Sequence, residues 1–300
     1  MNLKSSAFFC LLFLLVSCKP QEVVENYLIE IDEFEALSKL KTTKIIDFRK
    51  IEAYNSGHIK KAIHIWRSDI EDPTFMYGGM KASQKQIESL FSKLGIENDD
   101  TLLIYDDKGL CDAARLWWVL QYYNFKNVKL LNGGLTTLKN ANKPFTKETS
   151  SNSPSIFTLK GINADLFASK EQIKNAIKNK SVILDTRTTD EYKGKYIKKG
   201  AFRAGRIPSS KLIDWANAID YNGDKKMKSV SELKEIYTDI SPDKNAPVFV
   251  YCHSGVRSAH TTFVLTQLLG YTHVLNYDGS WTEWSYHQDL PIINDSRSIK

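Results

Sequence analysis

The stretch VFVYCHSGVRS, from Val248 to Ser258, joins an apolar run to a small polar loop that begins with a cysteine. An apolar run bounded by turn residues is typical of a buried strand, and the residues from Ala259 to Leu269 predict a helix. In a strand, loop and helix of this kind, inward-pointing main-chain N–H groups and the helix N-terminus stabilise an anion. We therefore expect Cys252 to be a nucleophile with a lowered pKa.

The six residues after the cysteine are candidates for holding an anionic substrate or a charged sulfur. Gly255 allows a close approach of the main chain, and Arg257 is suited to binding an anion. The other candidates act through their main-chain N–H groups, and the full set is His253, Ser254, Gly255, Val256, Arg257 and Ser258. The simpler interpretation of Cys252 is a small buried residue at the end of a strand.

An internal repeat argues for the functional interpretation. The segment from Tyr105 to Leu138 aligns without a gap on the segment from Tyr251 to Trp284. In this alignment, Asp106 takes the place of Cys252 and Cys111 takes the place of Arg257. A purely structural requirement would have acted on both halves alike, so the difference indicates that only the second half carries the chemistry.

The repeat also defines the domain organisation. Short apolar runs alternate with amphipathic stretches in each half, which predicts an α/β fold with two parallel sheets, each flanked by helices on both faces. Thr146 to Pro154 is polar and without periodicity, which is typical of a linker. We expect a first domain over 18–145, a linker over 146–160 and a second domain over 161–300.

The two halves differ in length at one place. Two residues separate Tyr54 from Gly57 in the first half, whereas twelve separate Tyr192 from Gly205 in the second. This insertion is a candidate loop on the substrate side of the second domain.

The N-terminus predicts export. A basic start and the apolar run from Ala7 to Val16 are typical of a secretory signal, too short to span a bilayer. The sequence from Leu15 to Cys18 resembles the lipobox of bacterial lipoproteins. We expect cleavage after residue 17 and a lipid on Cys18, which would fix the protein to a bacterial membrane outside the cytoplasm.

Composition argues against several other classes. The net charge of +6 comes from scattered lysines and arginines, so no nucleic-acid-binding stripe is expected. Only Cys111 and Cys252 remain after the signal and the lipid site, so no disulfide framework is indicated. The six histidines show no metal-ligand spacing. We expect no metal, no cofactor and a monomeric protein.

Together these motifs resemble the two-domain sulfurtransferases, the family of rhodanese and 3-mercaptopyruvate sulfurtransferase. The similarity covers nearly all of the chain after the signal. The segments that carry it are Tyr105-Asp106, Ala113 to Trp118, Gly205 to Pro208, Cys252 to Ser258 and Asp278 to Trp284. The resemblance implies a catalytically silent first domain and a second domain that carries sulfur as a persulfide on Cys252.

The resemblance also implies how substrates bind. It places Arg187 at a family arginine that holds the anionic group of the donor, with a surface or interdomain ion pair as the alternative. It makes Arg203 an uncertain counterpart of a second such arginine. The loop HSGVRS matches neither the loop sequence typical of family members that use thiosulfate nor the one typical of members that use mercaptopyruvate. We expect thiosulfate as the preferred donor, and cyanide or a thiol as the acceptor.

Three other classes compete with this interpretation. A cysteine phosphatase or arsenate reductase also places a cysteine and an arginine in one loop, but its loop is one residue longer than the six residues from Cys252 to Arg257. A membrane-tethered rhodanese domain without turnover, acting in binding or sulfur relay, is the main alternative. A papain-like catalytic pair of a cysteine and a histidine is less favoured, because His260 is expected on the surface of a helix.

Overall fold

The computed structural model describes residues 26–297. The predicted signal and the lipid site Cys18 lie outside these residues and stay predictions. No helix within residues 26–297 has the length and apolarity needed to cross a bilayer.

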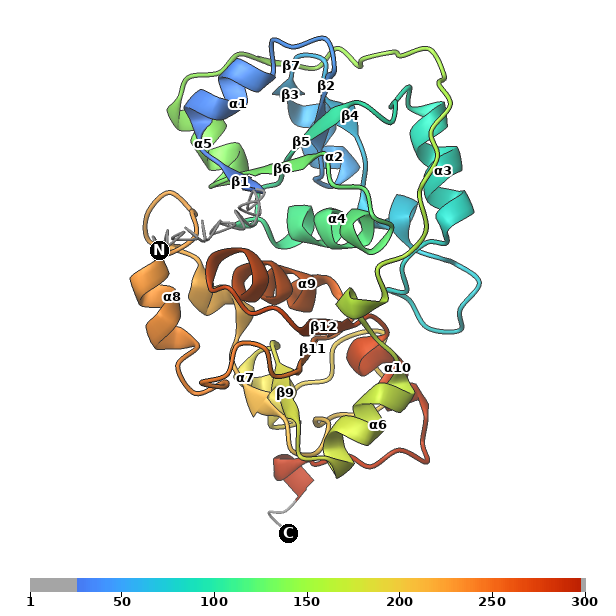
Figure 1. Cartoon of the computed structure of the whole chain (residues 1–300), viewed down its shortest axis with the longest axis vertical. Helices are drawn as coiled ribbons and strands as arrows, with labels where there is room; N and C mark the ends of the chain where they lie inside the picture. Colours follow the sequence, from blue (N-terminus) through green and yellow to red (C-terminus); the bar gives the residue numbers. More distant parts are fainter. Residues whose placement is uncertain (1–25, 298–300) are drawn as a thin grey trace, which may run out of the picture.

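The first half forms a parallel five-stranded sheet in the order β1-β6-β5-β2-β4 (Figure 1). Its strands are Leu28–Ile29 (β1), Thr43–Asp47 (β2), Ile63–His64 (β4), Thr101–Tyr105 (β5) and Val128–Leu131 (β6). Its helices are Ile31–Leu37 (α1), Ile51–Ser56 (α2), Gln84–Lys93 (α3), Cys111–Tyr122 (α4) and Gly134–Asn140 (α5). A small antiparallel pair joins His58–Ile59 (β3) to Phe145–Thr146 (β7).

The second half repeats this topology. Its parallel sheet has the order β8-β12-β11-β9-β10, which matches the first sheet strand for strand. The strands are Phe167–Ala168 (β8), Val182–Asp185 (β9), Lys211–Leu212 (β10), Val248–Tyr251 (β11) and Val274–Tyr277 (β12). The helices are Lys170–Lys178 (α6), Thr189–Tyr192 (α7), Val230–Ile236 (α8), Val256–Phe263 (α9) and Ser280–Tyr286 (α10). The predicted duplication of an α/β unit is confirmed.

Three apolar clusters hold the two sheets and their helices together. Along β11, Val248 and Val250 face one cluster while Phe249 and Tyr251 face another, as the two-residue period of a strand requires. The outer face of each sheet has its own cluster, under α1, α2 and α5 in the first half and under α6 and α10 in the second. The inner faces share a single cluster, so the two halves are packed into one body.

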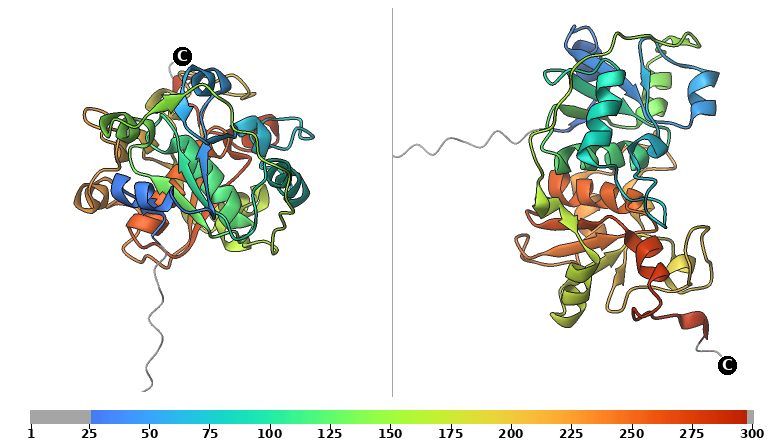
Figure 2. Two further views of the ribbon diagram at one scale, coloured as in Figure 1. Left: turned by 90° about the horizontal axis from the view of Figure 1, so that it is seen from above. Right: turned by 90° about the vertical axis from the view of Figure 1, so that its right-hand side faces the viewer.

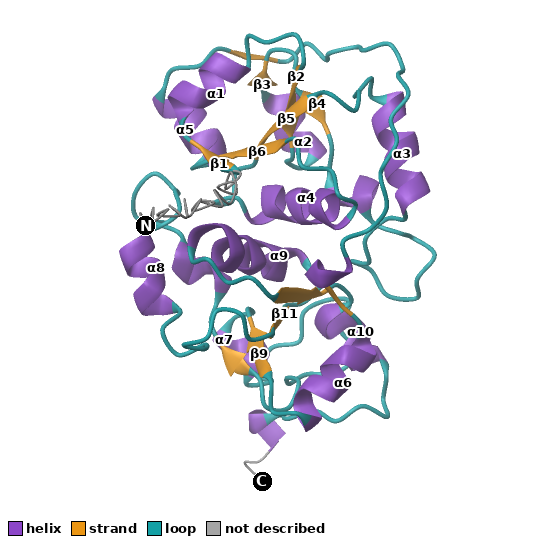
Figure 3. Ribbon diagram, viewed as in Figure 1, coloured by secondary structure: helices purple, strands orange, loops and turns teal. Residues whose placement is uncertain are grey.

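The shared cluster is centred on α4 and α9, which lie side by side between the two sheets (Figures 1 and 3). Trp117 of α4 meets Phe263 of α9 edge to face, with ring centroids 4.9 Å apart. The view from the side shows these helices as a double layer between the sheets (Figure 2). Each of the two helices follows the central strand of its own sheet. The packing of α4 on α9 therefore brings the loop between β5 and α4 close to the loop between β11 and α9.

Local signals fixed several boundaries correctly. Ser83 and Ser229 close the predicted capping boxes of α3 and α8 with Gln86 and Glu232. The helix expected from Ala259 instead begins at Val256, so half of the cysteine loop is already helical.

The segment predicted as a linker, 146–160, runs in extended conformation along the first half (Figure 1). Phe157 is buried in this segment against Phe91 and Phe125. Its main-chain N–H bonds the Ser92 hydroxyl. Packing therefore fixes this predicted linker to the first domain.

Candidate active site

Cys252 lies at the carboxyl end of β11, directly before the loop that leads into α9. Its side chain is buried, and the residue is only 1% exposed. The Ser258 hydroxyl donates to the sulfur at 3.5 Å, and the main-chain N–H groups of Ser254 and Ser258 also bond it. Burial alone would raise the pKa of this thiol, but the charge of Arg257 and these hydrogen bonds lower it below the usual value. The expected thiolate cradle is therefore present around Cys252.

Ser280 completes the cradle and was not found from the sequence. Its hydroxyl accepts from the main-chain N–H groups of Cys252 and Gly255 at 3.1 and 3.0 Å, and it donates to the carbonyl of Tyr277 at 2.6 Å. Ser280 has a left-handed backbone with φ of 50°, a conformation that costs a side-chain-bearing residue about 1 kcal/mol or more. The first half has Gly134 at the equivalent position, with φ of 51°. The difference between Gly134 and Ser280 in the aligned repeats is the sequence signal that could have identified Ser280 as a site residue.

Arg257 acts on the sulfur through its charge while being held by another residue. Its guanidinium makes two hydrogen bonds to the carboxylate of Glu191 in α7, at 2.7 and 2.9 Å. The pair lowers the pKa of Glu191 to about 2 against the effect of its burial. Glu191 therefore remains ionised and fixes the position of Arg257, which keeps a positive charge near Cys252.

The silent half shows what the cradle binds when it is filled. The Asp106 carboxylate, at the position equivalent to Cys252, accepts hydrogen bonds from four main-chain N–H groups. The distances lie between 2.8 and 3.0 Å, and the donors are Lys108, Leu110, Asp112 and Ala113. Their counterparts in the second half are Ser254, Val256, Ser258 and Ala259. The loop shape of this fold therefore holds an anion.

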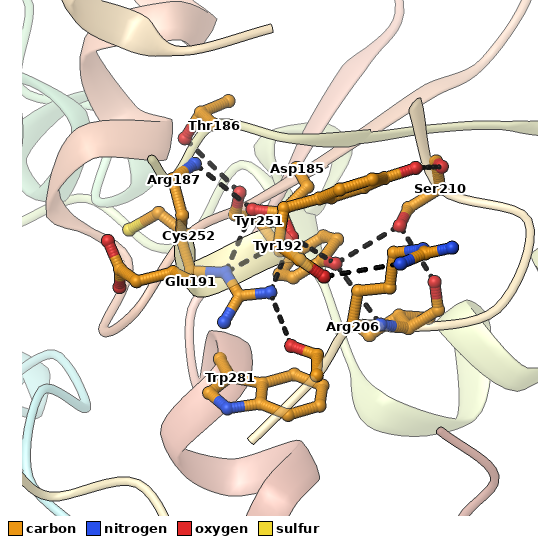
Figure 4. Close-up of polar contacts among 12 residues, drawn as sticks. Asp185, Thr186, Arg187, Glu191, Tyr192, Arg206, Ser210, Tyr251, Cys252 and Trp281 are labelled. Carbon is orange, nitrogen blue, oxygen red and sulfur yellow. Dashed lines mark hydrogen bonds and ion pairs between the residues drawn. The ribbon is translucent and has the colours of Figure 1, made fainter. Parts of the chain in front are cut away.

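Arg187 belongs to a buried hydrogen-bond network within the second domain. Its guanidinium is buried and paired with Asp185, with Nη2 to Oδ2 at 2.5 Å, and it also donates to the carbonyl of Gly205 (Figure 4). Tyr251 donates to the same carboxylate at 2.6 Å, and the Trp281 ring covers the guanidinium. These contacts occupy Arg187 within its own domain and argue against the donor-binding role that the resemblance implied.

The first half contains the same network, which supports a structural role for Arg187. Arg49 pairs with Asp47 and donates to the carbonyl of Gly57, while Tyr105 donates to the Asp47 carboxylate. The arrangement matches that of Arg187, Asp185, Gly205 and Tyr251 contact for contact. Since it occurs in a half without the cysteine, it serves the fold.

Arg203 is also a structural residue. Its guanidinium donates to main-chain carbonyls at the end of α10, including those of Ser285 at 3.2 Å and His287 at 2.7 Å. A cation at this position complements the carbonyl end of the helix. The uncertain assignment of Arg203 to anion binding is therefore not supported by its placement.

The histidines near the site are uncharged at neutral pH. Burial and the nearby charges of Lys198 and Arg257 lower the pKa of His253 to about 4, and its Nε2 bonds the carbonyl of Lys199 at 3.0 Å. His260, expected on a helix surface, is instead fully buried against the Trp215 ring, and burial lowers its pKa to about 3. The surface expectation was wrong because α9 is enclosed between the two sheets.

The first half covers the cysteine loop of the second. Arg115 of α4 pairs with Asp278 at 2.7 Å and approaches the carbonyl of Gly255. Gly79 packs so closely on Ser254 that an added Cβ would lie 2.5 Å from the Ser254 Cβ. The silent domain is therefore one wall of the active site.

Comparison with known proteins identifies the fold. The model of the Rhodanese-like domain matches residues 30–141 and 169–287, one match in each half. The chain belongs to the rhodanese family. The crystal structure of the 3-mercaptopyruvate sulfotransferase SseA from Escherichia coli has this rhodanese fold, with a TM-score of 0.76, 22% identity and coverage of 86% of this chain and 99% of that chain.

Curated rhodanese relatives are closer in sequence. The sulfur carrier protein TtuD of Thermus thermophilus is 36% identical over 250 residues, which cover 80% of this chain and 86% of that protein. A putative thiosulfate sulfurtransferase, SseA of Mycobacterium bovis, is 36% identical over 251 residues, with 80% and 81% coverage. These similarities support sulfurtransferase activity for this rhodanese.

The second cysteine of this rhodanese has the opposite electrostatic environment. Cys111 begins α4 and is buried, and both burial and the neighbouring carboxylate of Asp112 raise its pKa well above the usual value. It therefore remains a thiol at neutral pH and is a poor nucleophile. The two cysteines differ because burial and Asp112 act together on Cys111, whereas Arg257 and the Ser258 hydroxyl offset burial at Cys252.

Replacing Ser258 with alanine is expected to raise the pKa of Cys252, because the sulfur loses a hydroxyl donor that favours its charged form. The thiolate then forms only at higher pH, so the alkylation rate at pH 7 falls about threefold to tenfold. Iodoacetamide labelling of the Cys252 peptide, followed by mass spectrometry across a pH series, measures this shift. An unchanged midpoint would show that Ser258 does not act on the sulfur.

Proposed function

We propose that Cys252 takes a sulfane sulfur from a small anionic donor, holds it as a persulfide and gives it to a thiophilic acceptor. Thiosulfate is the donor we favour over 3-mercaptopyruvate, and cyanide or a thiol is the acceptor. The anion cradle carries the proposal, because the equivalent loop of the silent half holds a carboxylate through four main-chain N–H groups. A persulfide on Cys252 would place its charged outer sulfur among the equivalent donors.

With thiosulfate, the Cys252 thiolate attacks the outer sulfur of the donor. A new S–S bond forms to Cys252, and the donor's own S–S bond breaks with its electron pair leaving on sulfite. Cyanide then attacks the outer sulfur of the persulfide, thiocyanate departs and the thiolate is restored. Both steps transfer a neutral sulfur atom, so neither needs a metal, an oxidant or a proton.

The names of the relatives support this class of reaction with different partners. Among them are a putative thiosulfate sulfurtransferase, a 3-mercaptopyruvate sulfotransferase and a sulfur carrier protein. The last of these keeps open the alternative of a relay module with little turnover. Steady-state turnover of the protein lacking residues 1–18, with thiosulfate or 3-mercaptopyruvate and with cyanide, tests the proposal. Absence of turnover with both donors, in a folded protein, would favour the relay module.

Since Arg187 is occupied, another cation should receive the donor anion. Lys198, in the insertion of the second half, interacts electrostatically with Cys252, Arg257 and Arg67. Arg257 is paired with Glu191, and Arg67 with Asp112. Lys198 makes no ion pair with a carboxylate among residues 26–297, and its side chain is exposed. The surrounding protein atoms and Arg257 lower its pKa, while the more distant Glu191 raises it. We infer that its ammonium group binds the donor's anionic end.

Replacing Lys198 with methionine is expected to raise the KM for thiosulfate about tenfold and to change kcat little. The reason is that a charge-assisted contact worth about 1.5 kcal/mol is lost from the bound donor. Steady-state kinetics at fixed ionic strength measures both constants, with Lys41→Met as the control at an exposed lysine of the first half. An unchanged KM would remove Lys198 from the donor site.

A further inference from the structure

Two segments, one from each half, flank the cysteine loop and expose apolar side chains. The first is residues 72–81, the light-blue loop at the right of Figure 1, and the second is the insertion, residues 193–204. Their exposed large apolar residues and exposed lysines, apart from Lys193, form what we call the entrance rim: Phe75, Met76, Lys195, Tyr196, Ile197, Lys198, Lys199 and Phe202.

The apolar members of the entrance rim are strongly exposed. Met76 is 80% exposed, Phe202 is 57% exposed and Tyr196 is 54% exposed. Rings from the two segments meet on Tyr286 of α10, with centroid distances of 5.7 Å to Tyr77 and 6.4 Å to Phe202. An exposed apolar cluster of this kind, contributed by two domains, is typical of an interaction site.

The entrance rim is directly connected to the residues around Cys252. In the first segment, the Gly78 carbonyl accepts from the Thr282 hydroxyl at 3.2 Å, and Gly79 contacts Ser254. In the second segment, the Lys199 carbonyl bonds His253 at 3.0 Å. A partner on the rim would therefore sit against the loop that holds the sulfur.

The second segment is also basic. Between residues 193 and 203 it carries Lys193, Lys195, Lys198, Lys199 and Arg203, and no acidic residue. Arg203 is used internally by main-chain carbonyls, and Asp295 lies near Lys193. The remaining three lysines are exposed and give the rim a positive potential that an acidic partner would complement.

The silent half provides an internal comparison. Its cysteine-equivalent loop is covered by residues 218–227 of the second half, where Ile219 contacts Gly109 and Asp224 contacts Gly133 in the neighbouring loop. Ile219 and Met227 of this cover are buried, and Tyr221 is its exposed large apolar residue. The first half also lacks the ten-residue basic insertion. A loop can therefore be covered without an exposed phenylalanine and methionine and without a basic insertion, and both features occur only beside Cys252.

We propose that the entrance rim is the docking site of a protein acceptor whose thiol lies on an exposed acidic segment. The proposal rests on the function proposed above and names the acceptor class. The acceptor thiolate bonds to the outer sulfur of the Cys252 persulfide, the bond to Cys252 breaks, and Cys252 leaves as a thiolate. The transferred sulfur keeps its negative charge and Cys252 keeps the bonding electron pair, so the exchange is balanced without an oxidant or a proton. The apolar rim supplies contact area and the lysines attract the acidic segment.

The test uses the full chain, loaded with thiosulfate and freed of excess donor. Two twelve-residue peptides, each with one cysteine and two leucines, differ only in carrying glutamates or lysines, and mass spectrometry follows their persulfidation. The glutamate peptide is expected to discharge the persulfide about tenfold faster than the lysine peptide at low salt. Phe75→Ser with Met76→Ser, and separately Lys195→Glu, should slow the glutamate peptide about fivefold or more and leave cyanide turnover within twofold.

Matched controls are Ile156→Ser, at an isoleucine that is 86% exposed, and Lys41→Glu. Neither should change the peptide rates. Equal rates for the two peptides, or rim variants that behave like the controls, would overturn the docking proposal while cyanide turnover stands. Rim variants are also measured for binding to phosphatidylglycerol vesicles. If they lose vesicle binding and keep the peptide rates, the docking proposal is overturned and the rim is assigned to membrane binding. Absence of both persulfide and cyanide turnover would instead refute the proposed function itself.

Discussion

Replacing Cys252 with serine is expected to reduce sulfur transfer from thiosulfate to cyanide by at least about 1000-fold. The cradle around this residue stabilises a thiolate through Arg257, Ser258 and main-chain N–H groups. A serine hydroxyl in the same place stays protonated at neutral pH and forms no persulfide. Colorimetric detection of thiocyanate measures the loss.

The matched control is Cys111→Ser. Cys111 is buried, and its pKa is raised well above the usual value, so its replacement should leave turnover within about twofold. The two variants together separate the catalytic cysteine from the structural one. Persistent turnover in Cys252→Ser, or its loss in Cys111→Ser, would contradict the assignment.

Replacing Arg187 with methionine should destabilise the protein by about 3–5 kcal/mol, because the Asp185 carboxylate is left buried without its cation. Tyr251, which donates to the same carboxylate, keeps only part of the network. The expected effect is a lower denaturation midpoint in urea, accompanied by loss of folded enzyme. In the fraction that remains folded, the KM for thiosulfate should change far less than in Lys198→Met.

Arg49→Met provides the control in the silent half. Because Arg49 makes the equivalent pair with Asp47, its replacement should cost a similar free energy of unfolding. A donor-binding role for Arg187 would give a different pattern, with a raised KM at unchanged stability and no such effect at Arg49. Urea denaturation of both variants, together with steady-state kinetics, distinguishes the two roles.

Much of the site was predictable because it is encoded locally. Cys252, Gly255 and Arg257 are separated by a few residues, and a strand followed by a tight loop and a helix places such residues in one turn. The exchange of Cys252 for Asp106 between the halves points to the second half as the catalytic one. In the structure, the loop of the first half is filled by the Asp106 carboxylate and that of the second half surrounds the Cys252 sulfur. The residues that complete the site come from elsewhere: Ser280 follows β12, Glu191 lies in α7 and Gly79 belongs to the other domain.

Arg187 shows why a matching motif was insufficient. An arginine two residues after Asp185 fits both a donor site and a buried ion pair, and only the side-chain direction separates these roles. Direction is set by parallel pairing, because the register places Tyr251 beside Asp185 and turns both toward the outer core of the sheet. The repeat of the same network around Asp47 held the answer, since residues shared by an active and a silent half serve the fold.

By itself, the sequence determined the duplication, the parallel α/β sheets and the position of the candidate nucleophile. These features depend on short-range periodicity and on residues adjacent in the chain. Tertiary structure decided which cationic side chains remain available to bind a donor. It also decided which residues of the first domain cover the cysteine loop and at which residue α9 begins. These properties depend on how α4 packs against α9 and on which carboxylates meet which arginines across the shared core. Side-chain pairing over long sequence distances is fixed only when the chain is folded.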